Sequence, residues 1–234
     1  MTAHTTTNGE ASTTKPETAV AIGIVDYGLG NIRSVTRGLE RGGATVTLVD
    51  DPDRFSSFDG IVLPGVGAFR EGVENAGPYR DALVEIASTG TPVFGICLGM
   101  QMLLSSSEEA EHAGEGDAIG LSVIPGRNVR FRGDQKVPHM GWNQLRIRRD
   151  HPVFRGIDGG YAYFVHSYYA EPDDQNAIVA TSDYGVDFPA IIANERGNVF
   201  GTQFHPEKSG DVGLTILRNF TAYCANAPVS DDSS

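Results

Sequence analysis

The chain has 234 residues, 40% of them hydrophobic, which is enough to bury at least one core. Its 30 acidic residues outnumber its 18 basic ones, and the net charge of -12 argues against nucleic acid as the main ligand, because phosphate binding needs a basic face. Because there are two cysteines and no apolar run near the roughly 18 residues of a membrane helix, we expect a cytoplasmic protein.

Arginine greatly outnumbers lysine among the basic residues. Lys15, Lys136 and Lys208 are the three lysines, and the other fifteen basic residues are arginines. An acidic, lysine-poor surface is typical of a protein adapted to concentrated salt, where screening relieves the repulsion between like charges. Ordinary charge for solubility is the alternative interpretation, and the composition leaves both open.

The amino-terminal part of the chain alternates strands with helices. Apolar runs rich in β-branched residues predict buried strands over residues 20–26, 44–49, 60–63 and 92–96. Helices are predicted over residues 32–41 and 71–88 and from residue 98, the second of them interrupted at Gly77-Pro78. Asn31 can cap the first helix. This alternation predicts a parallel, doubly wound sheet with helices on both faces.

The carboxyl-terminal part has a different pattern. Strand-like runs occur over residues 129–131, 145–147, 161–169, 177–181 and 189–193. We interpret them as an antiparallel or mixed extension of the same sheet, followed by a strand over residues 199–204 and a helix over residues 213–224. The simplest partition is one domain over residues 19–225, with disordered tails over residues 1–18 and 226–234 and a charged loop over residues 108–117.

The sequence Gly95-Ile96-Cys97-Leu98-Gly99 places a cysteine between a predicted strand and a predicted helix. Small residues on both sides allow the sharp turn of a nucleophile elbow, here with sulfur in place of oxygen. The amino terminus of the following helix would favour the reactive thiolate. The alternative is a structural cysteine buried at a strand end, which we expect for Cys224 on the apolar face of the last helix.

The sequence Gln203-Phe204-His205-Pro206-Glu207 supplies a proton partner for such a thiolate. His205 ends an apolar strand, and residues two apart in an extended chain point the same way. Glu207 can therefore orient the His205 ring, as the acid does in a catalytic triad. A solvated His and Glu in a loop would be the alternative, but the elbow and this motif together are more specific than either alone.

A glycine-rich loop, Pro64-Gly65-Val66-Gly67, follows the third predicted strand. Loops at the carboxyl ends of parallel strands form the active site in open sheets, and a loop of this kind can turn backbone N–H groups toward an oxyanion. Gly65 and Gly67 would let the peptide unit at Val66 switch direction. A plain turn between strand and helix is the alternative.

Several other motifs are incomplete. Gly28-Leu29-Gly30 would begin a dinucleotide fingerprint, but its third glycine position holds Arg33. The sequence has no P-loop, no H-E-x-x-H and no C-x-x-C, so we expect neither a cofactor nor a metal site.

These motifs make the chain resemble the class I (triad) glutamine amidotransferases over about residues 19–224. Within that family it is most similar to the branch that supplies ammonia for imidazole glycerol phosphate synthesis in histidine biosynthesis. The resemblance rests on the motifs above and on three further stretches, which are residues 26–31, Pro138-His139-Met140-Gly141-Trp142-Asn143 and Phe164-Val165-His166-Ser167-Tyr168. It implies a flavodoxin-like α/β domain.

The resemblance also implies a role for each motif. Cys97 would attack the glutamine carboxamide to form a thioester, His205 would move the protons, and Glu207 would hold His205. The oxyanion would be bound by backbone N–H groups at Leu98 and in the Gly65-Val66 loop. The positions that match glutamine-binding residues of the family are Gly67, Gln101, Ser167 and Tyr168. The positions that match its partner-facing residues are Asn31, Met140, Trp142, Tyr163 and Lys208.

The implied partner is a (β/α)₈ cyclase that forms a heterodimer with this chain and receives its ammonia. Two alternatives lie close to this hypothesis, namely a glutaminase subunit for another biosynthetic synthase and a catalytically silent regulatory subunit. A third is a cysteine hydrolase or chaperone-like thiol protein of related fold, which gives no reason for Lys208 and Trp142 at a partner face.

Overall fold

The structure, a computed structural model, describes residues 19–109 and 118–227. The tail expected over residues 1–18, residues 228–234 of the tail expected over residues 226–234, and residues 110–117 of the expected charged loop lie outside the described residues. No helix within the described ranges is both long enough and apolar enough to cross a membrane.

The described residues build one large sheet of eight strands, whose parallel half was predicted from the sequence. In spatial order its strands are β2 (Thr45–Val49), β1 (Ala21–Val25), β3 (Gly60–Leu63), β4 (Val93–Ile96), β13 (Val199–Thr202), β12 (Asp187–Ala193), β11 (Ile178–Asp183) and β8 (Arg146–Ile147). The five strands from β2 to β13 pair in parallel, and β12, β11 and β8 continue the sheet in antiparallel pairing.

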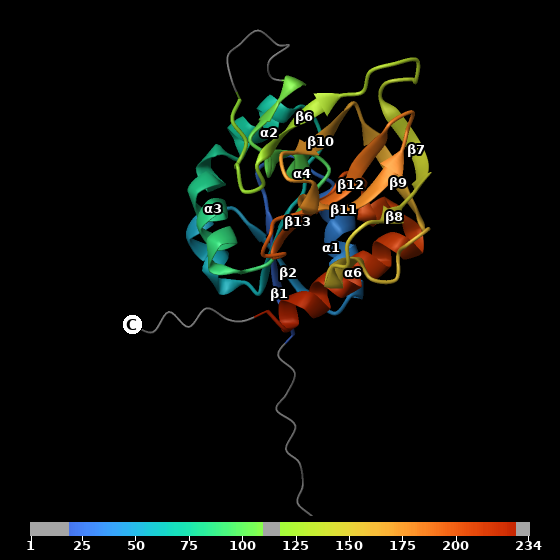
Figure 1. Cartoon of the computed structure of the whole chain (residues 1–234). Coiled ribbons are helices and arrows are strands. Elements are labelled where there is room, and N and C mark those ends of the chain that lie inside the picture. Colours follow the sequence, from blue (N-terminus) through green and yellow to red (C-terminus); the bar gives the residue numbers. More distant parts are fainter. Residues whose placement is uncertain (1–18, 110–117, 228–234) are drawn as a thin grey trace, which may run out of the picture.

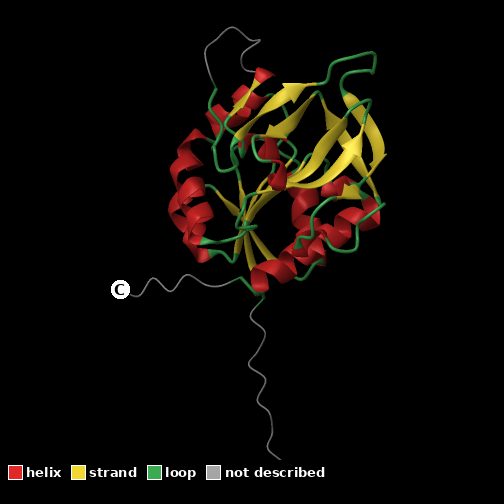
Figure 2. Cartoon of the chain, in the orientation of Figure 1, coloured by secondary structure: helices red, strands yellow, loops and turns green. Residues whose placement is uncertain are grey.

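Helices cover both faces of this sheet, as Figures 1 and 2 show. On one face α1 (Ile32–Arg41) packs beside α6 (Gly210–Ala225). The other face carries α2 (Phe69–Asn75), α3 (Arg80–Thr89) and α4 (Leu98–Met102). The predicted helix over residues 71–88 is thus two helices, separated by a 3₁₀ turn at Gly77–Tyr79, because Pro78 cannot continue the hydrogen-bond ladder.

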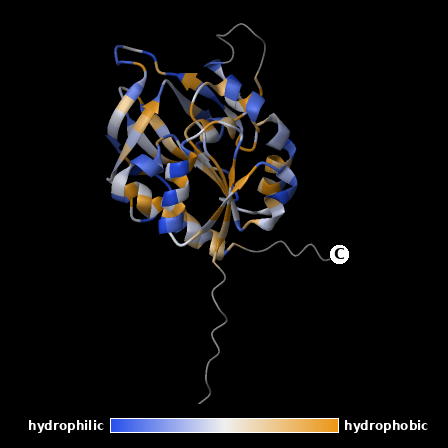
Figure 3. Ribbon diagram, turned by 180° about the vertical axis from the view of Figure 1, so that it is seen from behind, coloured by the Kyte–Doolittle hydropathy of each residue, from blue (hydrophilic) through white to orange (hydrophobic). Residues whose placement is uncertain are grey.

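Two hydrophobic clusters result, one on each face of the sheet. Val62 of β3 packs with the α1 and α6 side, whereas its neighbours Ile61 and Leu63 pack with the α2 to α4 side. This is the alternation expected of a strand buried on both faces. Figure 3 shows the apolar strands concentrated at the centre of the molecule.

The expected extension of the sheet is partly wrong, because two small sheets stand apart from the large one. One contains β5 (Ser106–Ser107), β6 (Gly126–Arg130) and β10 (Tyr168–Pro172), and the other pairs β7 (His139–Gln144) with β9 (Tyr161–His166). The predicted strand over residues 161–169 is therefore two strands in two sheets. β7 was missed altogether, since glycine and asparagine interrupt its apolar pattern.

The register of the parallel strands places three segments at one edge of the sheet. Leu63 of β3 lies opposite Gly95 of β4, and Thr202 of β13 lies opposite Ile96. The residues that follow these strands are the glycine-rich loop, Cys97 and the Gln203 to Glu207 segment. The fold therefore brings all three predicted motifs together.

Candidate active site

Cys97 occupies a sharp turn between β4 and α4. Its φ is 53° and its ψ is -106°, a region that costs a non-glycine residue on the order of 1–3 kcal/mol. Hydrogen bonds hold this backbone in place, from Cys97 N to Thr202 O at 2.7 Å and from Gln101 N to Cys97 O at 3.1 Å. The turn fits the nucleophile elbow predicted from the sequence.

Close backbone packing around Cys97 requires glycine at positions 95 and 99. A Cβ atom on Gly99 would lie 1.8 Å from the carbonyl oxygen of Leu63, and one on Gly95 would lie 2.7 Å from the backbone nitrogen of Met100. Both contacts are with backbone and cannot be relieved by moving a side chain. The Gly-x-Cys-x-Gly pattern is thus what lets β3, β4 and α4 approach so closely.

His205 and Glu207 form a buried pair. Nδ1 of His205 lies 3.0 Å from Oε1 of Glu207, and the two side chains are 2% and 1% exposed. The pairing was predicted, but its geometric reason was wrong, because the chain is not extended between them. Pro206 begins a 3₁₀ turn, Pro206–Lys208, and this turn brings the carboxylate back to the ring.

The environment of His205 favours its protonated form. Burial lowers the pKa of this imidazole, but the neighbouring Cys97 sulfur and the hydrogen bond that His205 donates to Glu207 more than offset burial, so the pKa is raised to about 9. Because Nδ1 of His205 is hydrogen-bonded to Glu207, the ring nitrogen that interacts with the Cys97 sulfur is Nε2. Nε2 is buried and has no partner at ordinary hydrogen-bond geometry among the described residues. The arrangement can keep an imidazolium beside the sulfur.

A pocket of about 280 Å³ opens beside Cys97 and His205. The residues that line it are Val66, Gly67, Cys97, Leu98, Gln101, Glu109, Pro138, Val165, His166, Ser167, Tyr168 and His205. The four positions expected to bind glutamine from the family resemblance, Gly67, Gln101, Ser167 and Tyr168, are all among them. The structure therefore brings these residues together around the sulfur.

The glycine-rich loop lies against the amino terminus of α4. A Cβ atom on Gly65 would lie 2.8 Å from Gly99 N and 2.6 Å from the hydroxyl of Tyr27, which itself donates a hydrogen bond to Pro64 O. Gly67 has a φ of 109°, whereas Gly65 does not have a positive φ. Of the two glycines, one is needed for its backbone conformation and the other for the close approach.

The residues expected at a partner face lie around the β7–β9 sheet and the triad. Met140 and Trp142 on β7 are 63% and 56% exposed, and the Trp142 ring packs edge-on against Tyr163 of β9. Lys208 is exposed at the end of the 3₁₀ turn. Asn31 does not cap α1 with its side chain. Its Nδ2 donates a hydrogen bond to Oε1 of Glu207 at 3.3 Å.

Several buried polar residues have no role assigned from the sequence. His139 and His166 face each other across β7 and β9, with His139 Nδ1 3.1 Å from His166 Nε2. Gln203 is fully buried beside Cys97, and Glu109 lines the pocket. The signal that could have found the histidines is their position among alternating aromatic residues of two strands, where a polar group needs a polar partner.

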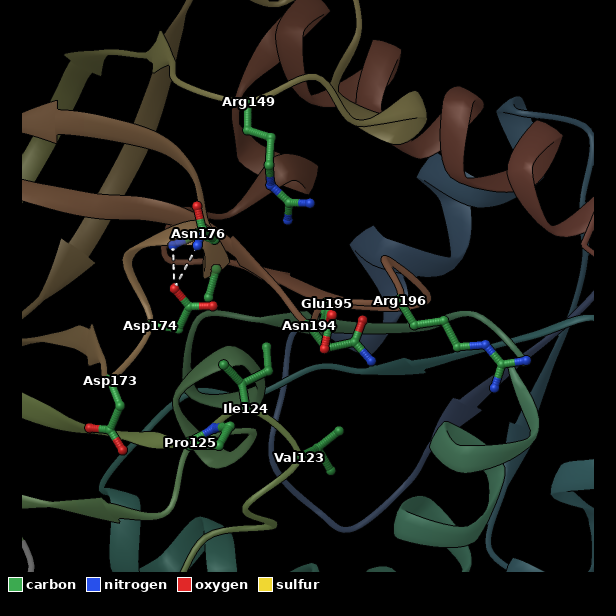
Figure 4. A pocket seen from close by; sticks show the side chains of 11 residues that line it. Val123, Ile124, Pro125, Arg149, Asp173, Asp174, Asn176, Asn194, Glu195 and Arg196 are labelled. Atoms are coloured by element: carbon green, nitrogen blue, oxygen red, sulfur yellow. Dashed lines mark hydrogen bonds between the residues drawn. The ribbon is translucent and has the colours of Figure 1, made fainter.

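A larger pocket lies elsewhere among the described residues. It has a volume of about 1070 Å³ and contains none of the predicted site residues. Figure 4 shows it beside the turn at Asn194 to Arg196, which precedes β13 and so lies at the sheet edge opposite Cys97. The smaller pocket is the candidate active site, because it contains Cys97 and His205. Across residues 19–109 and 118–227, no three His, Cys, Asp or Glu side chains are grouped to hold a metal ion.

Comparisons with known proteins agree with this geometry. Residues 23–223 match the family model for glutamine amidotransferase class-I. The chain is 73% identical over 201 residues to the imidazole glycerol phosphate synthase subunit HisH of Natronomonas pharaonis, covering 86% of this chain and 94% of the relative. It is 69% identical over 206 residues to the HisH subunit of Halobacterium salinarum, covering 88% and 94%.

A solved structure shares the fold. PurLQS from Thermotoga maritima superposes with a TM-score of 0.70 at 21% identity, covering 88% of this chain and 99% of that chain. At this identity the likeness concerns the fold alone. The α/β architecture and the family resemblance predicted from the sequence are confirmed.

Proposed function

The chain belongs to the class I glutamine amidotransferases, and from this premise we propose that it is the glutaminase subunit of an imidazole glycerol phosphate synthase. The observation that carries the proposal is the position of Cys97, on a strained turn beside the buried His205–Glu207 pair and open to a pocket. The names of the relatives support the choice of synthase.

The chemistry begins with nucleophilic attack. The Cys97 thiolate attacks the carboxamide carbon of glutamine, and the oxyanion that forms accepts hydrogen bonds from Leu98 N–H and from the loop at Gly65 and Val66. Protonated His205 gives its proton to the leaving nitrogen, so ammonia departs and a glutamyl thioester remains. His205 then takes a proton from water, which attacks the thioester and releases glutamate and the thiolate.

Glu207 acts through His205. Its Oε1 accepts the hydrogen bond from Nδ1 and so leaves Nε2 toward the sulfur. A carboxylate in this position fixes the ring and stabilises the imidazolium without itself accepting the proton.

The pocket suits a small zwitterion. Glu109, whose Oε2 accepts a hydrogen bond from Phe69 N at 2.8 Å, supplies a negative charge for the α-ammonium group. Gln101, Ser167, Tyr168 and Gly67 supply the neutral polar groups that hold the rest of the substrate.

The chemistry of the product, ammonia, requires a partner enzyme that consumes it. Ammonia that escapes into water becomes ammonium, which is not a nucleophile, so a sealed interface with the consuming enzyme is needed. The exposed Met140 and Trp142 give this face the apolar character of an interaction site. Together with Asn31, Tyr163 and Lys208 they form the face that we assign to a (β/α)₈ cyclase, in a heterodimer. The free thiols of Cys97 and Cys224 accord with the reducing cytoplasm.

A glutaminase assay tests the proposal. We expect the lone chain to release little glutamate from glutamine, and the complex with the cyclase to release more when acceptor nucleotide is bound. Stimulation by a different synthase would mean that the chain serves another pathway. A complex that makes product from ammonium salts but never from glutamine would identify a catalytically silent subunit.

A further inference from the structure

Gln203 contacts the nucleophile. Its side chain is fully buried, and its Nε2 lies 3.9 Å from Sγ of Cys97, within hydrogen-bond range for sulfur. The backbone of this residue is held by a hydrogen bond from Gln203 N to Ala190 O at 2.9 Å. Gln203 precedes His205 by two residues, so both side chains reach the sulfur from the segment that follows β13.

The orientation of the Gln203 amide follows from its neighbours. The carbonyl oxygen of Tyr168 can only accept hydrogen bonds, so Gln101 must present its NH₂ group there, at 3.0 Å. The same NH₂ group lies 3.3 Å from Oε1 of Gln203 and donates to it. With its oxygen engaged by Gln101, Gln203 has its NH₂ group on the sulfur side.

Two buried histidines fix the other end of this network. His166 Nδ1 lies 2.8 Å from Tyr168 O and donates to it, so a neutral His166 must accept at Nε2 the hydrogen bond from His139 Nδ1. Burial lowers the pKa of His139 to about 4 and that of His166 to about 3, which keeps both neutral. Every donor from His139 to Gln203 therefore has one possible direction.

We propose that Gln203 is a further catalytic residue, whose side-chain N–H stabilises the Cys97 thiolate and is held toward the sulfur by the buried network of Gln101, Tyr168, His166 and His139. This inference rests on the proposed function of the site. A donor strengthens its hydrogen bond when the acceptor becomes charged, so Gln203 favours the ionised sulfur. It acts in both half-reactions, since the thiolate is the attacking group first and the leaving group when the thioester is hydrolysed.

The test separates thiolate stabilisation from turnover. Iodoacetamide alkylation of Cys97 is measured against pH in the lone chain without glutamine, and the modified peptide is quantified by mass spectrometry. Gln203→Met removes the N–H donor, whereas Gln203→Glu keeps an acceptor for Gln101 and places an oxygen against the sulfur. Gln175→Glu, at an exposed position, is the matched control. None of the other titratable groups around Cys97 is changed in these variants. These groups are His205 and Tyr27 and, on the pocket wall, Glu109, His166 and Tyr168.

We expect alkylation of Cys97 near neutral pH to be about tenfold slower in Gln203→Met, because a smaller fraction of the sulfur is ionised, and slower still in Gln203→Glu. Glutaminase kcat in the complex should fall by about tenfold, with KM changed less. The control should match the unmutated chain. Unchanged alkylation profiles in both Gln203 variants would overturn the proposal, whatever the fate of glutaminase activity.

A second measurement does not use a Gln203 variant and so does not depend on whether such a variant folds. In the unmutated chain labelled with ¹⁵N-glutamine, the Gln203 side-chain amide signal should shift as Cys97 ionises, and this shift should be absent in Cys97→Ala. An amide signal that does not respond to Cys97 ionisation would overturn the proposal. A normal response in a chain without glutaminase activity would instead contradict the proposed function.

Discussion

Asn31 Nδ2 lies 3.3 Å from Oε1 of Glu207, although the two residues are separated by 176 positions in the chain. The same carboxylate oxygen accepts from His205 Nδ1 at 3.0 Å. The loop before α1 is therefore hydrogen-bonded to the proposed triad. Because Asn31 also belongs to the face assigned to the cyclase, docking of the partner can act on Glu207 through a single side chain.

The first prediction compares the two members of the buried pair. Glu207→Gln keeps an acceptor for His205 Nδ1 and loses the charge, whereas His205→Ala removes the proton carrier itself. Glutaminase kcat in the complex should fall by about 10²–10⁴ in His205→Ala, as expected for lost general acid–base catalysis, and by less in Glu207→Gln. Equal losses in steady-state assays would show that Glu207 does more than orient the ring.

The second prediction concerns pH. The pKa of His205 is raised to about 9 in the folded chain, from an ordinary value near 6.5, so the imidazolium persists at neutral pH and is lost as the pH rises through about 9. Glutamate release by the complex should therefore decline above about pH 9. In Glu207→Gln this alkaline decline should move to lower pH, because one cause of the raised pKa is gone. An unmoved decline would assign it to another group.

The same shift predicts a pH dependence of stability. A folded-state pKa above the unfolded one gives stabilisation that is complete below about pH 6.5 and lost as the pH rises through about 9. Urea denaturation should show the free energy of unfolding falling over this window in the unmutated chain, and falling less in His205→Ala. Parallel curves for the two chains would contradict the assignment.

Much of this site was predictable because its signals are local. Cys97 between two glycines and His205 before a proline stand in short segments whose strand and loop character the sequence shows. The parallel pairing of the amino-terminal strands follows from their alternation with helices. The loop at Gly65 was also predicted from a local signal, the glycine-rich segment that directly follows a strand.

The unpredicted parts depend on contacts between distant segments. β7 contains glycine and asparagine, and its pairing with β9 is visible only when Trp142 meets Tyr163 and His139 meets His166. Asn31 was expected to cap α1, but its side chain makes no capping hydrogen bond and instead donates to Glu207. No local sequence pattern around Asn31 predicts its hydrogen bond with Glu207.

The third prediction tests the glycine-rich loop. A Cβ atom on Gly65 would lie 2.7 Å from Leu98 Cβ and 2.8 Å from Gly99 N, so Gly65→Ala must push the loop away from the oxyanion. Losing one oxyanion donor costs about 10²–10³ in rate, so glutaminase kcat should fall by that order, with glutamine KM changed far less. Gly77→Ala is the control, because a Cβ atom there has nothing within 4 Å. Similar kinetics for the two variants would place the oxyanion donors elsewhere.

The fourth prediction concerns salt. With a net charge of -12, repulsion between acidic groups weakens when ions screen them, and the Debye length falls to about 3 Å at 1 M salt. The melting temperature should rise by several degrees between about 0.1 M and 2 M potassium chloride. Sucrose of matched osmolality controls for exclusion effects. A melting temperature indifferent to salt would leave ordinary solubility as the reason for the acidic composition.

The most direct test of the proposed function is the Cys97→Ala complex with the cyclase, assayed for nucleotide product with glutamine and, separately, with ammonium salts at high pH. The thiolate is needed to release ammonia but not to use it. We predict that product formation from glutamine is abolished while formation from ammonium salts remains close to that of the unmutated complex. Glutamine-dependent product from the Cys97→Ala complex would show that Cys97 is not the nucleophile and would contradict the account.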